Sequence, residues 1–409
     1  MPNIILPFAF LIISGSIFYS SSKFFQDNDV DLESARVSIP DFNLTPEEEL
    51  GKNLFFDKIA SPDNMSCADC HVPEVGFTGP TPGINAHGAV YPGAVPQRFG
   101  NRKPPSAAYA TLSPVFFYND EEGLFVGGNF WDGRATGERL ENPAADQALG
   151  PFLNPVEQNN ASKEAVLVQV AKSKYAKLWE EVWDEPISVE TPLDVEKNFD
   201  RIGLAIAAYE GSEEVNQFSS KYDMVMAGDS RFTEEEDLGY DLFIGKALCS
   251  ECHPEPLFTD FTYDNLGVPK NPENPFYDMD SVYLDDGTQI NPQGSAWIDK
   301  GLGGFLETRP EWAGMAAENY GKHKVPTLRN VGKANSEEFP KAFMHNGVFK
   351  SLLEVVQFYN TRDVEDWPEP EVAENVNTDE LGNLDLTERE EAAIVAFMMI
   401  LSDGYMPEK

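Results

Sequence analysis

Two short cysteine–histidine motifs constrain this sequence more than any other feature. The first is Cys67-Ala-Asp-Cys70-His71 and the second is Cys249-Ser-Glu-Cys252-His253. Together they contain all four cysteines and two of the five histidines of the chain. This spacing is typical of c-type haem attachment, because two thiols add to the vinyl groups along one side of the porphyrin and the next residue can bind the iron. The sequence therefore predicts two covalently bound c-type haems.

Three other interpretations of the cysteine pairs explain less. Two disulfides would suit an exported chain, but they do not require a histidine after each pair. A zinc ribbon has its pairs ~15–20 residues apart, and Cys70 and Cys249 are far beyond that spacing. A thioredoxin-like redox motif does not account for two copies that each end in histidine.

The chain also repeats itself just before these motifs. The segments Thr45–Phe55 and Thr233–Phe243 share threonine, glutamate, leucine, glycine and phenylalanine at matching positions. Each begins with a capping box, formed by Thr45 with Glu48 and by the corresponding pair of the second copy. A short amphipathic helix is therefore expected before each haem motif. A duplication over this distance indicates two homologous domains and not a solenoid.

Other helices are predicted from apolar residues at helical spacing. They fall around residues 171–182, 195–209 and 387–401, and the last has a capping box of Thr387 with Glu390. Long stretches rich in glycine, proline and asparagine lie between them, and no convincing alternation of strand residues is present. We expect an all-α fold of two cytochrome-c-like haem domains with long irregular loops, at residues 40–228 and 229–409.

The amino terminus has the pattern of a targeting segment. Ile4 to Tyr19 is almost wholly apolar and is followed by three serines. The run has the length of a signal-peptide core and is short for a membrane span, which needs ~20 residues. No lysine or arginine precedes Lys23, which leaves an uncleaved anchor as the alternative. We expect residues 1–22 to be a signal peptide or anchor and the rest to be periplasmic.

The strong negative charge excludes some partners. The formal net charge is −39, from 30 basic and 69 acidic residues. Such a chain repels phosphate backbones, so nucleic-acid binding is not expected. A cationic partner would be steered towards it, although acidity can also serve only to keep a protein soluble.

A motif-dense segment between the two haem motifs distinguishes an enzyme from an electron carrier. This segment contains three motifs, Asn129-Phe-Trp-Asp-Gly-Arg134, Gln147-Ala-Leu-Gly-Pro151 and Asn154-Pro-Val-Glu157. Two more motifs follow the second haem motif, Lys324-Val-Pro-Thr-Leu-Arg-Asn330 and His345-Asn-Gly347. With the haem motifs, this order resembles the bacterial dihaem cytochrome c peroxidases and their MauG-like relatives over residues 40 to 402.

The resemblance implies an enzyme that reduces hydrogen peroxide to water. Its electrons would come from a small donor protein such as a cytochrome or a cupredoxin. A MauG-like enzyme that oxidises residues of a partner protein is the alternative within the same chemistry. A dihaem electron carrier without catalysis is an alternative of another class, and the motif-dense segment argues against it.

The resemblance also assigns roles to individual residues. The first domain would hold the peroxidatic haem and the second domain the electron-transfer haem, and His71 and His253 would be the proximal iron ligands. Trp131 would lie between the haems and help electrons cross. The distal side of the first haem would carry Gln147, Pro151 and Glu157.

Chemistry supports a catalytic role for Glu157. Heterolytic cleavage of a peroxide removes a proton from one oxygen and adds one to the other. A single carboxylate in a poorly solvated pocket can do both, if its pKa lies near the working pH. The alternative is that Glu157 is merely one of many solvated acidic residues.

The resemblance suggests three further metal ligands, which are His87, Asn101 and Tyr359. His87 matches the place of a distal histidine that binds the first iron in many relatives, or it is an exposed loop residue. Asn101 resembles the side-chain ligand of a calcium ion at the domain interface. His323 and His345 are expected to be structural.

Tyr359 is the third of these ligands, and it separates the two branches of the family. Ser351 and Glu354 predict a helix start, and Leu352, Val355, Val356 and Tyr359 then share one apolar face. Counted from His345, Tyr359 stands where MauG-like relatives bind the second iron with tyrosine and peroxidases use methionine. A phenolate stabilises ferric iron, whereas methionine raises the potential. The alternative is a core tyrosine, with Met344 or another methionine as the ligand.

Overall fold

The computed structural model describes residues 42–336 and 338–407. The chain from Asn43 onward forms one compact unit. Its α-helices and strands, in chain order, are α1 (Pro46–Phe56), α2 (Pro82–Asn85), β1 (Phe117–Asn119), β2 (Leu124–Val126), α3 (Pro143–Leu153), α4 (Lys163–Val170), α5 (Ala176–Trp183), α6 (Pro192–Glu210), α7 (Lys221–Ala227), α8 (Glu234–Ile244), α9 (Cys249–Cys252), β3 (Tyr263–Asp264), α10 (Gly301–Leu306), β4 (His323–Lys324), α11 (Leu352–Thr361) and α12 (Glu388–Met399). Strand β1 pairs with β2 and β3 with β4, both antiparallel. The mostly helical fold with long loops agrees with the expected class, apart from these short strands.

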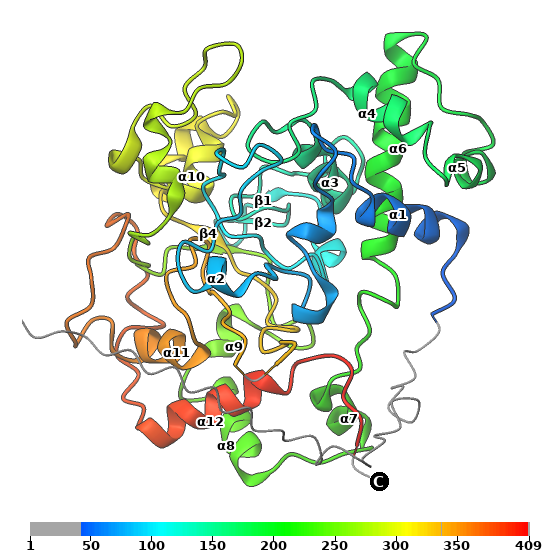
Figure 1. The fold of residues 1–409 in the computed structure, drawn as a ribbon. Coiled ribbons are helices and arrows are strands. Elements are labelled where there is room, and N and C mark those ends of the chain that lie inside the picture. Colours follow the sequence, from blue (N-terminus) through cyan, green and yellow to red (C-terminus); the bar gives the residue numbers. More distant parts are fainter. Residues whose placement is uncertain (1–41, 337, 408–409) are drawn as a thin grey trace, which may run out of the picture. The chain divides into compact units, whose positions relative to one another are not determined.

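Each half of the unit is built on one pair of closely crossing helices. Helix α1 packs on α6 in the first half, and α8 packs on α12 in the second (Figure 1). A Cβ atom at Gly51 would lie 1.8 Å from the carbonyl oxygen of Ala205, and one at Gly239 would lie 2.0 Å from that of Ala393. Because no side chain fits at either crossing, glycine lets the two backbones touch. The duplication seen in the leading helices therefore extends to the closing helices.

The capping boxes predicted for these helices are present. At α1, Thr45 Oγ1 accepts from the backbone N–H of Glu48, and the Glu48 carboxylate accepts from the N–H of Thr45. Thr233 with Glu236 does the same at α8, and Thr387 with Glu390 at α12. These reciprocal bonds satisfy backbone donors that a helix start leaves unpaired. The two haem-leading helices are thus fixed by sequence signals that are purely local.

One expected helix differs from the structure. The helix predicted over 171–182 is broken, because α4 ends at Val170 and α5 begins at Ala176. Tyr175 leaves the helical conformation at this break, and its hydroxyl donates to Asp57 at 2.8 Å. Helix α7 lies before the boundary predicted at residue 228, yet its Tyr222 belongs to the apolar core of the second half.

A third apolar core joins the two halves. Phe116 and Phe125 of the first half pack there against Tyr263, Leu302 and Leu306 of the second half. Phe116 and Phe125 are stacked at 5.3 Å between ring centroids, and Tyr263 meets Phe116 edge to face at 6.0 Å. This junction core fixes the first half against the second beside the cavity described below.

The targeting prediction falls outside the part of the chain that is described. Residues 1–22 are not among the described residues. Within residues 42–407, no helix is long and apolar enough to cross a membrane.

The glycine crossings generate a test of the duplicated fold. We expect Gly239→Ala to lower the stability of the protein by ~1–3 kcal/mol, the usual cost of overpacking a tight contact. Gly314→Ala is the matched control, because a Cβ there meets no atom within 4 Å. Thermal unfolding followed by circular dichroism measures both. Equal melting temperatures for the two variants would contradict the close crossing of α8 and α12.

Candidate active site

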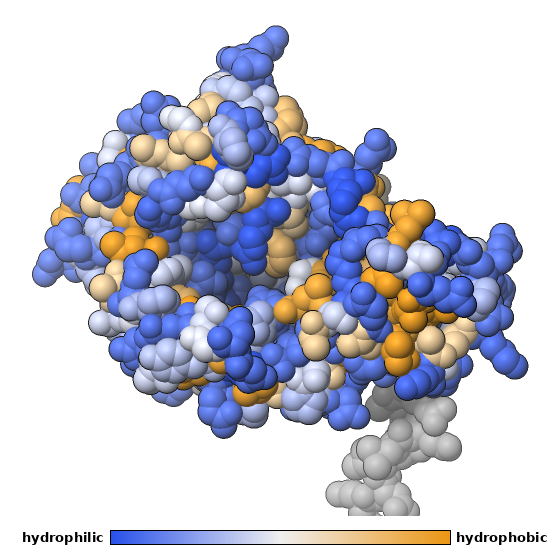
Figure 2. All heavy atoms as spheres, turned by 90° about the horizontal axis from the view of Figure 1, so that it is seen from above, coloured by the Kyte–Doolittle hydropathy of each residue, from blue (hydrophilic) through white to orange (hydrophobic). Residues whose placement is uncertain are grey.

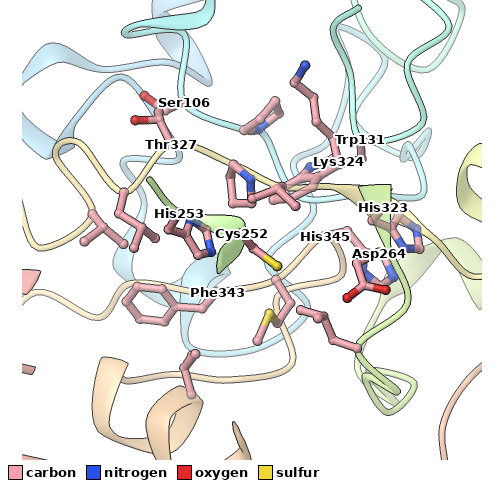
Figure 3. Close-up of a pocket in the computed structure, with 18 of the residues that line it drawn as sticks. Ser106, Trp131, Cys252, His253, Asp264, His323, Lys324, Thr327, Phe343 and His345 are labelled. Carbon is pink, nitrogen blue, oxygen red and sulfur yellow. The ribbon is translucent and has the colours of Figure 1, made fainter. Parts of the chain in front are cut away.

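A single cavity reaches both cysteine–histidine motifs. From the first half it is lined by His71, Trp131 and Gln147, and from the second half by Cys249, Cys252, His253 and Tyr359. Figure 3 shows His253 and Cys252 beside each other, with Trp131, Lys324, His323 and His345 towards one side of the same cavity. The residues predicted to serve two different haems therefore share one continuous space.

The two motif histidines are held in the same way. His71 Nδ1 lies 3.1 Å from the carbonyl oxygen of Phe77, and His253 Nδ1 lies 2.8 Å from that of Phe258. A carbonyl only accepts hydrogen bonds, so Nδ1 carries the proton in each ring and Nε2 keeps a lone pair. Burial lowers the pKa of both imidazoles, that of His253 to about 4. Both rings are thus neutral and preset as metal ligands through Nε2.

A second repeated segment is hydrogen-bonded to the loop around each motif histidine, and these two loops are called the histidine loops. Thr78 Oγ1 donates to the carbonyl of Pro104 at 2.8 Å, and Thr259 Oγ1 donates to that of Val325 at 2.7 Å. The hydroxyls of Ser106 and Thr327 in turn donate to carbonyls of the two histidine loops at 2.8 and 2.6 Å. The segments Lys103–Ser106 and Lys324–Thr327 therefore occupy equivalent places in the two halves.

The cysteines complete a donor set that fits two covalent haems. None of the four is paired in a disulfide. Burial raises the pKa of Cys67 and of Cys249 to about 12, so these thiols are uncharged at neutral pH. Two thiols with two residues between them, each pair followed by a neutral imidazole on the cavity, are the groups that thioether attachment and axial ligation use.

Glu157 is positioned by a tight turn that follows α3. The N–H of Glu157 donates to the carbonyl of Asn154 at 3.0 Å, and the Asn154 side chain accepts from the N–H of Val156. Asparagine at the first position and proline at the second are the residues that such a turn favours. The Asn154 amide also donates to the Glu157 carboxylate at 2.6 Å. The Asn-Pro-Val-Glu motif thus both forms the turn and orients the acid.

The surroundings of Glu157 change its acidity. The side chain keeps some accessible surface, yet the loss of water around it raises its pKa. The charge of Arg134 and the hydrogen bond from Asn154 act to lower the pKa, but desolvation outweighs them. The negative charge of Glu157 in turn acts to raise the pKa of Cys70, and the next residue, Gln158, places its amide 3.9 Å from Cys67 Sγ. Glu157 therefore lies beside the first haem motif.

The other two residues predicted for the distal side lie on α3. Gln147 lines the cavity, and Pro151 stands in the last turn of the helix. The Pro151 carbonyl accepts from the N–H of Gln158 at 3.1 Å and so ties α3 to the Glu157 turn. The cavity lining includes neither Pro151 nor Glu157. The structure thus brings the three residues together along α3 and its turn, with Gln147 nearest the shared space.

Trp131 stands where the two halves meet. Its ring is buried, and Nε1 donates to the carbonyl of Lys103 at 2.9 Å. The N–H of Lys103 donates to the carbonyl of His345, and the N–H of Lys324 donates to that of Trp131. The His345 ring meets Trp131 edge to face at 6.5 Å. Trp131 is therefore attached to both halves through backbone contacts.

Charged residues next to Trp131 strengthen this junction. The Arg102 guanidinium bonds to Asp132 at 2.6 Å and forks onto Asp299 with two bonds of 2.6 Å. Burial acts to raise the pKa of Asp132, but Arg102 and Arg134 hold it below its usual value. The His323 and His345 rings, expected to be structural, are stacked at 3.5 Å beside Asp299.

Tyr359, predicted as a ligand of the second iron, lines the cavity near the second cysteine motif. It lines the cavity from α11, the helix predicted from Ser351, whose side chain accepts from the N–H of Glu354 at 3.1 Å. Burial and the nearby groups Cys252, Cys249 and Asp264 all raise its pKa. Without a cation in the cavity, Tyr359 is therefore a neutral phenol. Met344 and Met398 also line the cavity, so the iron ligand stays a prediction.

Two predicted metal ligands are not brought to the cavity. The His87 side chain is 68 % exposed, and its Nδ1 lies 3.2 Å from a carboxylate oxygen of Glu273. Ligation of the first iron by His87 would thus require its loop to move. Asn101 is held through its backbone, because its carbonyl accepts from the Asn274 amide at 2.9 Å. A calcium ion at Asn101 remains a prediction.

The sequence interpretation gave no role to three lysines. Lys103, Lys324 and Lys341 all line the cavity. The signal was available for two of them, because Lys103-Pro-Pro-Ser106 and Lys324-Val-Pro-Thr327 have the same pattern. Lys341 carries no comparable signal.

Comparisons with known proteins identify the family of this chain. A family profile described as di-haem cytochrome c peroxidase matches residues 45–231. The methylamine utilization protein MauG of Paracoccus denitrificans is 34% identical over 377 residues, which cover 87% of this chain and 88% of that protein. The cytochrome-c peroxidase IdrP1 of Denitromonas iodatirespirans is 27% identical over 358 residues, covering 86% and 80%.

A solved structure gives the same result. The diheme peroxidase BthA of Burkholderia thailandensis superposes with a TM-score of 0.71 at 28% identity, over 88% of this chain and 87% of that one. Fold and site together define a haem oxidoreductase. This chain belongs to the family of dihaem cytochrome c peroxidases and MauG proteins.

The position of Tyr359 generates a spectroscopic test. If Tyr359 binds the second iron, Tyr359→Phe should change the ferric spectrum of that haem and raise its reduction potential, because a hard anionic donor is lost. Near-infrared magnetic circular dichroism reports the ligand pair directly. A band of histidine–methionine ligation in the parent protein that survives Tyr359→Phe would assign the ligand to a methionine.

Proposed function

We propose that this protein activates hydrogen peroxide at the haem held by Cys67, Cys70 and His71 and takes the electrons from a small donor protein. The haem held by Cys249, Cys252 and His253 would receive these electrons first. The observation that carries this proposal is Glu157, a carboxyl group of raised pKa held by its own turn beside the first haem motif.

Glu157 suits proton transfer to and from peroxide. The haem supplies an iron centre that accepts peroxide and electrons. A carboxyl of raised pKa can take a proton from one peroxide oxygen and return it to the other near neutral pH. The Asn154 amide holds the carboxylate through Oε2 and fixes its orientation. Gln147, which lines the cavity from the helix before the turn, would hold the reacting molecule on the cavity side.

Trp131 supports electron transfer between the halves. Its buried indole stands at the backbone junction of Lys103 and His345, in the cavity that also contains His253. A rigid, desolvated aromatic ring between two redox centres needs little rearrangement when an electron passes. The donor would be a cytochrome or a cupredoxin with a basic docking face. Such a partner is steered by the net charge of −39, and Figure 2 shows a largely hydrophilic face.

A second candidate function is favoured by Tyr359 and by the 34% identity to MauG. In this alternative the enzyme oxidises residues of a partner protein instead of a donor. An anionic phenolate ligand would favour oxidised iron and so retain oxidising equivalents. The two candidates differ in what is consumed per peroxide, which is reduced donor in the first and a side chain of the partner in the second.

The proposed location is the periplasm. Support comes from the apolar run Ile4–Tyr19 and from two covalent haem motifs, since both fit an exported chain.

Replacing Glu157 with glutamine, the neutral amide of the same shape, tests its proposed role. We expect Glu157→Gln to retain both haems and the fold but to slow peroxide activation by ~10²–10⁴, the usual contribution of a positioned acid–base group. The group must be ionised to accept a proton, so the acid limb of the parent rate should lie above the ordinary glutamate pKa of 4.5. Stopped-flow absorbance against pH measures both effects.

The matched control for this experiment is Glu164→Gln. Glu164 is an exposed acid at the start of α4, in the same half of the protein. Its variant should react at the parent rate. If Glu157→Gln also reacts at the parent rate, Glu157 takes no part in peroxide activation.

A further inference from the structure

Two buried imidazoles at the junction of the halves carry ring nitrogens without a partner in the described chain. The side chains of His323 and His345 are 11 % and 6 % exposed, and within residues 42–407 neither Nε2 has a hydrogen-bond partner. Figure 3 shows the two rings side by side towards one side of the cavity. Solvent reaches neither Nε2, although both residues line the cavity. The two nitrogens are thus turned into the protein and not towards the space shared by the haem motifs.

The tautomer of His323 turns a lone pair towards a carboxylate. Its Nδ1 lies 2.9 Å from the carbonyl oxygen of Gly321, which can only accept, so Nδ1 carries the proton and Nε2 a lone pair. This Nε2 lies 3.4 Å from Asp299 Oδ2. Burial acts to raise the pKa of Asp299, but Arg102 holds it well below its usual value, so Oδ2 belongs to an anion. Two acceptors face each other here, which is costly unless a proton or a metal ion joins them.

A second pair of the same kind lies beside the first. His345 Nε2 is 3.9 Å from Glu371 Oε2, and burial lowers the pKa of His345 to about 4, so the ring is neutral. Glu371 is held through its other oxygen, which accepts from the N–H of Asp299 at 3.1 Å. One ring nitrogen of His323, one of His345 and a carboxylate oxygen of Asp299 lie within 4.8 Å of one another. Nitrogen and oxygen atoms that can bind a metal therefore converge at this point.

The charges of this region also favour a cation. Three largely buried carboxylates, those of Asp132, Asp299 and Glu371, lie near a single largely buried guanidinium, that of Arg102. Arg102 bonds to Asp132 and Asp299, and Arg134 reaches Asp132 with a side chain that is 44 % exposed. Within residues 42–407 no lysine or arginine forms an ion pair with Glu371. Buried carboxylates are costly unless they are paired, so a divalent cation would offset this excess of negative charge.

The spacing of the candidate ligands fits a transition-metal ion. Zinc binds nitrogen and oxygen at ~2.0–2.2 Å, so the ligand atoms of a tetrahedral site lie ~3.3–3.6 Å apart. The 3.4 Å between His323 Nε2 and Asp299 Oδ2 matches this value. The bond from His323 Nδ1 to the Gly321 carbonyl and the fork of Arg102 on Asp299 are outer contacts of the kind that orient metal ligands. The planes of the stacked histidine rings differ by 9°, so one ring must tilt before both lone pairs can reach one ion.

We propose that His323, His345 and Asp299 bind a divalent first-row transition-metal ion through the two Nε2 atoms and a carboxylate oxygen. Glu371 supplies the fourth ligand. Imidazole together with carboxylate suits zinc and its neighbours in the periodic table, whereas calcium takes oxygen ligands. The site is therefore distinct in its ligands from the calcium ion predicted at Asn101. All four ligands belong to the second half, beside its junction with the first.

Metal binding by the purified dihaem protein tests this proposal without using activity. The protein is treated with a chelator and then titrated calorimetrically with zinc, and we expect one zinc per chain, bound equally well in excess calcium. His323→Phe keeps an aromatic ring in the stack but removes its nitrogens. It should weaken zinc binding at least ~100-fold, because loss of an outer partner of a metal ligand already costs ~10–100-fold. The matched control, His87→Phe, removes the exposed imidazole beside Glu273 and should bind zinc like the parent.

Anomalous diffraction keeps the test independent of any folding defect in the variants. Crystals of the parent protein with zinc, measured above and below the zinc absorption edge, should show a peak between His323 and Asp299. If a proton and not a metal ion joins these two side chains, the parent binds no zinc and the proposal is wrong. Parent affinity in His323→Phe, displacement of the zinc by calcium, or zinc peaks only at other positions would equally overturn it.

Discussion

The hydrogen bond from each motif imidazole to a phenylalanine carbonyl is the interaction on which the rest of the site depends. It fixes the proton on Nδ1 of His71 and His253 and so presents an unprotonated Nε2 to the cavity. The carbonyls of Phe77 and Phe258 are held in place by the N–H groups of Ala107 and Leu328. The same arrangement of imidazole, carbonyl and N–H group therefore occurs twice, once for each haem motif.

The junction between the halves holds the two haem sites in a fixed relative position. Trp131, Lys103 and His345 are linked by backbone hydrogen bonds, and Arg102 joins Asp132 to Asp299 across the same region. Buried ion pairs of this kind fix geometry more than they add stability. A fixed junction keeps the distance between the redox centres constant, which electron transfer from one half to the other requires.

Local signals made much of this architecture predictable. The cysteine motifs, the capping boxes at Thr45 and Thr233 and the inward face with Tyr359 each depend on neighbours in sequence, and the structure contains each of them. The break at Tyr175 and the packing of Tyr222 on the second core depend on distant partners, which no local pattern specifies. The same holds for His87, whose partner Glu273 lies in the other half. The lysines at the cavity were given no role because a lysine in sequence is normally a surface residue, and only the fold removes it from water.

The central claim is that both haems, joined by one cavity, take part in a single peroxide reaction. The most direct measurement adds one equivalent of hydrogen peroxide to the fully ferric protein without a donor. The protein is then titrated with a one-electron reductant until the ferric spectrum returns. The account predicts a spectral change in both haems and the consumption of two reducing equivalents per protein. A ferric spectrum that peroxide leaves unchanged, with no reductant consumed, would contradict it and leave a dihaem electron carrier.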